Sequence, residues 1–256
     1  MILFVFEGEE REPLLFRTLE RMFFKKQNNI ICSFGNNIYE LYQLMLSYED
    51  DCSVVDVLKE YLLKRGDNTL SGIRSSDISE VFLFFDYDFQ NSQLSLGEIN
   101  ERLQAMLEKF DEETENGKLY INYPMVESIR YTKELPDSDY VNYTVHRSDC
   151  SNFKKMAKDF CRYDNLDYIV LKENEKPRKE RYSFIKDNWN HLVKMNVCKA
   201  NFLVWGINAM PDDKFSVGQI PIFKSQLDKF VNMNESVSIL NSFPIFLYEY
   251  LKVIKF

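Results

Sequence analysis

The amino-acid sequence predicts an α/β fold, in which a parallel sheet of about four strands is flanked by helices and followed by a mainly helical C-terminal region. Short apolar runs alternate with longer amphipathic segments through the first half, an order typical of parallel sheets with right-handed crossovers. The runs are apolar at consecutive positions, as expected for strands covered on both faces. The predicted strands are residues 1–6, 29–34, 80–85 and a fourth that begins at 119–121.

The segments between these strands carry helix signals. Apolar residues recur at helical spacing after Pro13, and a proline suits the first turn of a helix. Asn36 and Asn37 can cap the helix that follows the second strand. The turn Glu115-Asn116-Gly117 precedes the fourth strand. The predicted helices of the first half are residues 13–26, 38–46, a segment from 51 or 53 to 64, and 96–113.

The character of the chain changes near residue 131. We therefore expect an α/β domain at 1–130 and a mainly helical region at 131–256 that packs on the sheet. Residues 173–181 form a dense run of charges. The predicted helices of the second half are residues 151–161, 220–231 and 237–254, together with part of 189–210.

Composition narrows the classes of function. With 256 residues, of which 45% are hydrophobic, the chain can bury a substantial core. The net charge of −8 argues against binding nucleic acid by bulk electrostatics, so a local basic patch or a partner subunit would be needed. Five cysteines without CxxC spacing and two histidines predict reduced thiols in the cytoplasm and argue against a zinc site. No segment has the roughly 20 apolar residues that a membrane span needs.

Acidic residues follow two of the predicted strands. Glu7 comes directly after the first strand, and Asp86 and Asp88 follow the third. Open α/β sheets place their ligands at the carboxyl ends of parallel strands. Asp86 and Asp88 are two positions apart, so an extended chain points both side chains to the same side. Clustered carboxylates repel one another unless a cation joins them, and hard divalent cations prefer oxygen ligands. The sequence therefore predicts a metal site built from these three acids.

These strand ends resemble the Toprim fold, which is shared by topoisomerases, primases, the maturation ribonuclease of 5S RNA and overcoming-lysogenization-defect (OLD) nucleases. The stretch 6–13, Phe-Glu-Gly-Glu-Glu-Arg-Glu-Pro, looks most like the small Toprim proteins of bacterial anti-phage systems, which include the RloB-like group and OLD-type effectors. The stretch 122–127, Asn-Tyr-Pro-Met-Val-Glu, is similar to the region after the fourth strand in that group. The resemblance covers about residues 1–130. It implies a Mg²⁺- or Mn²⁺-dependent endonuclease that cleaves RNA such as tRNA, or DNA.

The resemblance also implies partners. A nuclease of this kind would act as the effector of an anti-phage system under the control of an ATPase partner, because the chain has no nucleotide-binding motif of its own. The sequence leaves both a monomer and a homodimer open. The alternative function is a catalytically silent Toprim scaffold or sensor that binds a partner ATPase or a phage protein. A third alternative, a phosphoryl-transfer enzyme with a covalent phospho-Asp86, lacks its expected downstream Ser/Thr and Lys residues.

Two further acids are candidate ligands. Glu127 could complete a second metal site of the two-metal type, or instead compensate charge at a helix N-terminus. Related nucleases often carry an acid four residues after the first glutamate, but this chain has Arg11 there, so one metal is expected rather than two. Of its neighbours Glu12 is the candidate ligand, with a solvated first-turn acid as the favoured alternative. Glu7 could act as a general base instead of a ligand.

The charge run offers a candidate nucleic-acid contact. Its basic side chains could bind a nucleic-acid backbone, although charge runs usually form a solvated face. His146, Lys154 and Lys155 are expected to be surface residues. The candidate nucleic-acid-binding residues are Lys172, Lys176, Arg178, Lys179 and Arg181.

Overall fold

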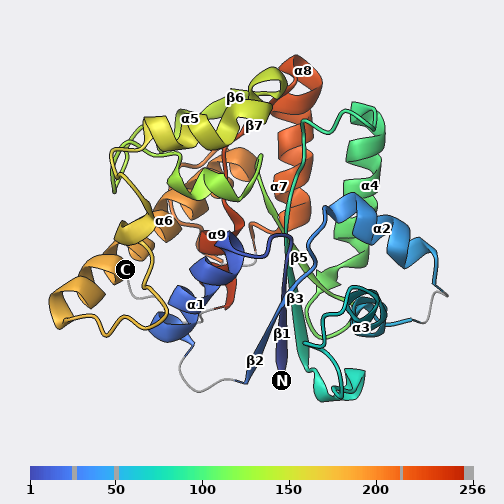
Figure 1. The fold of residues 1–256 in the computed structure, drawn as a ribbon. Helices are drawn as coiled ribbons and strands as arrows, with labels where there is room; N and C mark the ends of the chain where they lie inside the picture. The colour runs from blue at the N-terminus through green and yellow to red at the C-terminus, as the bar shows by residue number, and fades with distance from the viewer. Residues whose placement is uncertain (25–27, 49–51, 214–215, 251–256) are drawn as a thin grey trace.

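A computed structural model describes residues 1–24, 28–48, 52–213 and 216–250. Its centre is a five-stranded sheet with the strand order β2-β1-β3-β5-β4 (Figure 1). The first four strands in that order are parallel, which confirms the predicted parallel sheet, and the short β4 pairs antiparallel with β5. The strands are β1 (Ile2–Phe6), β2 (Asn29–Ser33), β3 (Glu80–Asp86), β4 (Asp111–Glu112) and β5 (Gly117–Asn122).

Helices flank the sheet on both faces, with α1 and α9 on one side and α2, α3 and α4 on the other (Figure 1). Three helices begin at side-chain caps that the local sequence supplies: Asn37 caps α2, Ser53 caps α3, and Ser95 with Glu98 forms a capping box at α4. The helices are α1 (Arg11–Phe23), α2 (Ile38–Leu46), α3 (Val54–Lys64), α4 (Leu96–Lys109) and α9 (Ser242–Tyr250).

An aromatic core joins α9 to the sheet. Phe84 of β3 stacks on Phe243 with ring centroids 4.8 Å apart, and Phe82 meets Phe246 edge-on at 5.0 Å. On the opposite face of the sheet Phe85 contacts Phe34. Buried residues from both halves of the chain form one hydrophobic cluster. The C-terminal helix is therefore part of the core beneath the carboxyl edge of the sheet, while the predicted boundary at residue 130 stays a prediction.

The second half contains the predicted helices and one unpredicted pair of strands. A long helix begins at Lys179, inside the charge run, and its C-terminal half includes much of the segment 189–210. Short 3₁₀ and π turns connect these elements. The helices and strands of this half are α5 (Phe153–Phe160), α6 (Lys179–Trp205), α7 (Gln219–Gln226), α8 (Asn232–Asn234), β6 (Thr144–His146) and β7 (Ser236–Ser238). The turns are η1 (Ser75–Asp77), η2 (Val126–Arg130), η3 (Tyr140–Asn142), η4 (Arg147–Asn152), η5 (Leu166–Tyr168) and η6 (Leu227–Val231).

Several predicted helix boundaries are wrong, and tertiary partners explain two of them. Helix α1 spans Arg11–Phe23 rather than 13–26, and positions 25 and 26 lie outside the described residues. The segment predicted as a helix from 237 starts as strand β7, because β6 pairs with it and the Gln226 amide bonds both Ser238 N and Ser238 O. The helix resumes at Ser242, and positions 251–254 lie outside the described residues. Helix α4 ends at Lys109 rather than at 113, because the next residues pair with β5. None of the described helices is long and apolar enough to cross a membrane.

Gly117, where β5 begins, lies against the side chains of β3, and a substitution there can test how tightly they pack. Its φ is +105°, and a Cβ there would lie 2.9 Å from Leu83 Cδ1 and 3.2 Å from Val81 Cβ. We predict that Gly117→Ala lowers the free energy of unfolding by about 2–4 kcal/mol, from backbone strain plus overpacking, in urea denaturation. Gly72→Ala is the control, since its φ is +78° and a Cβ would meet nothing within 4 Å. It should cost only about 1–2 kcal/mol, and equal losses would contradict the packing.

Candidate functional site

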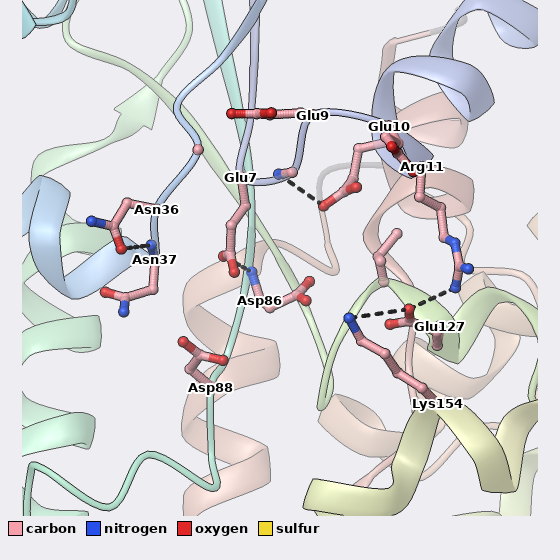
Figure 2. Close-up of a pocket in the computed structure, with 14 residues that line it drawn as sticks. Glu7, Glu9, Glu10, Arg11, Asn36, Asn37, Asp86, Asp88, Glu127 and Lys154 are labelled. Carbon is pink, nitrogen blue, oxygen red and sulfur yellow. Dashed lines mark hydrogen bonds and ion pairs between the residues drawn. The ribbon is translucent and has the colours of Figure 1, made fainter. Parts of the chain in front are cut away.

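A single pocket at the carboxyl edge of the sheet collects all five acids predicted for the site. Its volume is about 660 Å³, and acids from three separate segments of the chain, residues 7–12, 86–88 and 127, line it (Figure 2). Glu7 follows β1, Glu12 lies in the first turn of α1, Asp86 ends β3, and Glu127 lies in η2. The lining residues are Glu7, Gly8, Glu9, Glu10, Arg11, Glu12, Gly35, Asn36, Asn37, Asp86, Asp88, Val126, Glu127 and Lys154.

Parallel strand pairing brings Glu7 and Asp86 together. The register aligns Phe6 with Phe84, so both strands end at the same level. Glu7 N donates to Phe84 O at 3.0 Å, and Asp86 N donates to Glu7 Oε2 at 2.9 Å. The carboxylate of Glu7 is thereby held beside the end of β3, as the shared edge of parallel strands predicts.

A chain of hydrogen bonds fixes Asp86 from the side of β5. Asn122 Nδ2 donates to Asp86 Oδ1 at 3.0 Å. Asn122 Oδ1 accepts from Ser242 N at 3.0 Å and from Ser242 Oγ at 2.8 Å, so the amide group faces Asp86 with its nitrogen. The first residue of α9 thus orients a site side chain. Sequence reasoning missed this role of Asn122, for which the available signal was its place at the end of the fourth strand.

Asp88 lines the pocket for a different reason from the one predicted. The strand ends at Asp86, and Asp88 has a left-handed backbone with φ +48°, a conformation that Asp tolerates better than most residues. The expectation of two side chains on one side of an extended strand is therefore wrong. Gln90 Nε2 donates to Asp88 Oδ1 at 3.3 Å. A turn, rather than strand alternation, places Asp88 at the pocket.

Glu12 is buried, which rules out the favoured alternative of a solvated first-turn acid. Its side chain is 5% exposed, and Gly8 N donates to its Oε1 at 3.2 Å. A Cβ at Gly8 would lie 2.7 Å from Glu12 Oε2. A side chain at position 8 would therefore displace the Glu12 carboxylate from its present position beside the Gly8 backbone.

The buried acids destabilise one another's charged forms. Burial raises the pKa of Glu7 well above its ordinary value, and the charge of Asp88 raises it further. Burial also raises the pKa of Asp86 well above its ordinary value, with Glu7 as the second cause. The pKa values of Glu12 and Asp88 are raised as well, again mainly by burial. Such a group of acids is short of positive charge, which a bound cation would supply.

Two basic side chains sit on the Glu127 side of the pocket. Arg11 Nη1 lies 2.6 Å from Glu127 Oε1, and Lys154 Nζ lies 3.7 Å from the same oxygen. Glu127 is 3% exposed, and its Oε2 has no hydrogen-bond partner among the described residues. Arg11, seen in the sequence only as a departure from an expected acid, and Lys154, expected on the surface, are thus both site residues.

The predicted nucleic-acid-binding segment lies away from this pocket. None of its five basic residues lines the pocket. Arg21, near the C-terminal end of α1, donates to Lys172 O at 2.8 Å, whereas the pocket lies at the N-terminal end of that helix, about 15 Å away. Arg181 pairs with Glu175 and donates to Val170 O, so it anchors the loop. The structure does not bring this segment and the acids together.

The carboxylate oxygens of the pocket suit a hard divalent cation, but they are not positioned around a common point. Carboxylate oxygens are the ligands that Mg²⁺ and Mn²⁺ prefer. Within the part of the chain that the structure describes, no three His, Cys, Asp or Glu side chains are arranged to hold a metal ion. Sharing one ion would therefore require some of these acids to change rotamer.

No protein-family model, no curated protein and no solved structure matches the chain. The sheet order and the acidic pocket are therefore observations on this molecule alone, and the Toprim resemblance rests on the residues that carry it.

The raised pKa of Asp86 has a consequence for stability. A carboxyl whose pKa is higher in the folded than in the unfolded state favours folding when protonated, and this contribution is lost as pH rises through the folded value. We predict that Asp86→Asn, whose amide oxygen can still accept from Asn122, raises the melting temperature in EDTA at pH 7 by a few degrees. Each pKa unit corresponds to about 1.4 kcal/mol.

Thermal melts between pH 4 and pH 8 would measure this effect. The difference between Asp86→Asn and wild type should be smallest at pH 4, close to the ordinary pKa of an unfolded Asp of 3.8, and should grow as pH rises toward the raised pKa of the folded state. Glu101→Gln, an exposed acid on α4, is the control and should leave the melting temperature unchanged. A gain that does not depend on pH would contradict the electrostatic cause.

Proposed function

We propose that this chain is a Toprim-type endonuclease that uses Mg²⁺ or Mn²⁺ to hydrolyse phosphodiester bonds in RNA, such as tRNA, or in DNA. One observation carries the proposal: acids from three separate segments of the chain meet in a single pocket at the carboxyl edge of a parallel sheet. That edge is where open α/β sheets bind their ligands. RNA is the favoured substrate because a compact acidic chain has little surface for a long duplex.

The acids divide into a central set and two flanking members. Glu7, Asp86 and Asp88 would hold the ion. Glu12 and the Oε2 of Glu127, which has no hydrogen-bond partner among the described residues, would be additional ligands. A divalent ion in such a site supplies an activated water and neutralises charge on the attacked phosphate. Alternatively, Glu7 would act as a general base instead of a ligand, because burial and the charge of Asp88 raise its pKa and so make its carboxylate a stronger base.

The biological setting belongs to the same proposal. The resemblance of residues 6–13 to small Toprim proteins supports an effector of a cytoplasmic anti-phage system. An ATPase partner would control it, since the chain lacks a phosphate-binding loop of its own. Self-association into a homodimer is compatible with this setting.

A catalytically silent scaffold is the second candidate, and two observations favour it. The acids of the described residues do not converge on one point, and Arg11 occupies one oxygen of Glu127. A scaffold of this kind would use the same fold to bind a partner ATPase or a phage protein. It would have no need of a bound metal.

Nuclease assays would test the enzyme directly. We expect the wild-type protein with Mg²⁺ or Mn²⁺ to cleave tRNA or plasmid DNA, and Glu7→Gln and Asp86→Asn to lower the rate by about 10²-fold or more, because each removes a charge at the reacting site. Glu10→Gln is the control, since Glu10 is exposed at the rim of the same pocket. Equal cleavage by all four proteins would remove the proposed site.

Calorimetric titration with Mn²⁺ separates the two candidates. The nuclease predicts a saturable heat that Asp86→Asn abolishes, because Asp86 is buried within reach of the charges of Glu7, Glu12 and Glu127. The scaffold predicts no binding at millimolar Mn²⁺, together with a stable stoichiometric complex with an ATPase partner.

A further inference from the structure

Two basic residues lie together on one side of the acidic pocket. In Figure 2, Glu7 and Asp88 lie on one side, whereas Arg11 and Lys154 lie on the other, next to Glu127. Arg11 is the first residue of α1, and Lys154 belongs to α5, so two separate elements supply these cations. A ligand that enters the pocket would meet both the acids and this basic pair.

Glu127 holds Arg11 by a single contact. Arg11 Nη1 lies 2.6 Å from Glu127 Oε1, and this is the only hydrogen bond of the Arg11 side chain within the described residues. A guanidinium has five N–H donors, so most of its donors are left for another partner. The side chain is 37% exposed and lines the pocket, so those donors are accessible from it.

Lys154 adds a second positive charge to the same carboxylate oxygen. Its Nζ lies 3.7 Å from Glu127 Oε1, and its side chain is 74% exposed. One buried carboxylate therefore faces two cations and neutralises the charge of only one of them. Among the described residues, Arg11 and Lys154 are the two cations that line this otherwise acidic pocket. In a chain of net charge −8, a polyanion needs a local basic surface of this kind. The charge run at 172–181 does not provide it here, because it lies at the other end of α1.

We propose that Arg11 and Lys154 bind a phosphate group of the nucleic-acid strand, while Glu127 holds the guanidinium at the pocket wall. The planar guanidinium matches phosphate oxygens in a bidentate arrangement, and the ammonium adds a point charge. This assignment rests on the proposed function, since it names the residues that would hold the substrate of that site. It gives the arginine that interrupts the acidic stretch 7–12 a chemical role.

Fluorescence anisotropy with a fluorescein-labelled, 20-nucleotide single-stranded RNA in EDTA tests the assignment without cleavage. We expect Arg11→Ala to weaken binding about tenfold, which is the size of one charge-assisted hydrogen bond. The slope of log affinity against log salt should become shallower by about 0.7 for each phosphate contact that is lost. Lys154→Ala should shift both quantities in the same direction.

Two matched controls remove the same charges elsewhere. Arg162 also makes an ion pair with a glutamate, at 2.8 Å from Glu134, and Lys155 is the exposed neighbour of Lys154. Neither lines the pocket. Arg162→Ala and Lys155→Ala should change RNA affinity less than twofold. A double variant, Arg11→Ala with Glu127→Gln, avoids leaving a buried unpaired charge and should show the same loss as Arg11→Ala alone.

The outcomes separate this inference from the proposed function. The assignment is overturned if Arg11→Ala and the double variant bind RNA as tightly as the wild-type protein does. It is also overturned if the wild-type protein binds no RNA. Mn²⁺ calorimetry reports on the metal site independently, and Arg11→Ala should retain Mn²⁺ binding. The wild-type protein could bind no Mn²⁺ while Arg11→Ala still weakens RNA binding. That combination would refute the metal-dependent nuclease but support the phosphate contact.

Discussion

The parallel pairing of β1 with β3 places two acids that are 79 residues apart in the sequence at one edge of the sheet. The hydrogen bond from Asp86 N to Glu7 Oε2 is a direct consequence of that register. On the other side of β3, the pairing with β5 aligns Asp86 with Asn122. Every other feature of the pocket, from the turn at Asp88 to η2, is built around these three strand ends.

The pocket is electrostatically costly, and the aromatic core beneath it offsets that cost. Buried acids with raised pKa values oppose folding at neutral pH. Directly below, Phe6 and Phe84 stack with Phe243 of α9, and burial of such rings contributes a large apolar area. The same helix begins with Ser242, which orients Asn122 toward Asp86. Helix α9 therefore supports the site in two ways, because it packs beneath the strand ends and orients Asn122.

Opposite charges share the pocket without cancelling. The acids at the strand ends suit a divalent cation, and the pair of cations around Glu127 suits a phosphate. Both would serve phosphodiester hydrolysis, because a divalent ion can activate the attacking water and the basic side chains can bind the negatively charged phosphate. The arrangement is thus consistent with the proposed nuclease, and it gives Arg11 a function that an isolated comparison of motifs does not reveal.

The sequence by itself determined the parallel sheet, the helices of the first half and the acids at its edge, because apolar runs, caps and strand ends are local signals. The pairing of β6 with β7 and the early end of α4 could not be predicted, because distant partners decide them. Tertiary structure alone buried Glu12, set Asn122 against Asp86 and separated the charge run from the pocket. It also placed Arg11 and Lys154 beside Glu127. Arg11 is 116 positions from Glu127 in the sequence, and contacts between such distant residues leave no periodic trace in the chain.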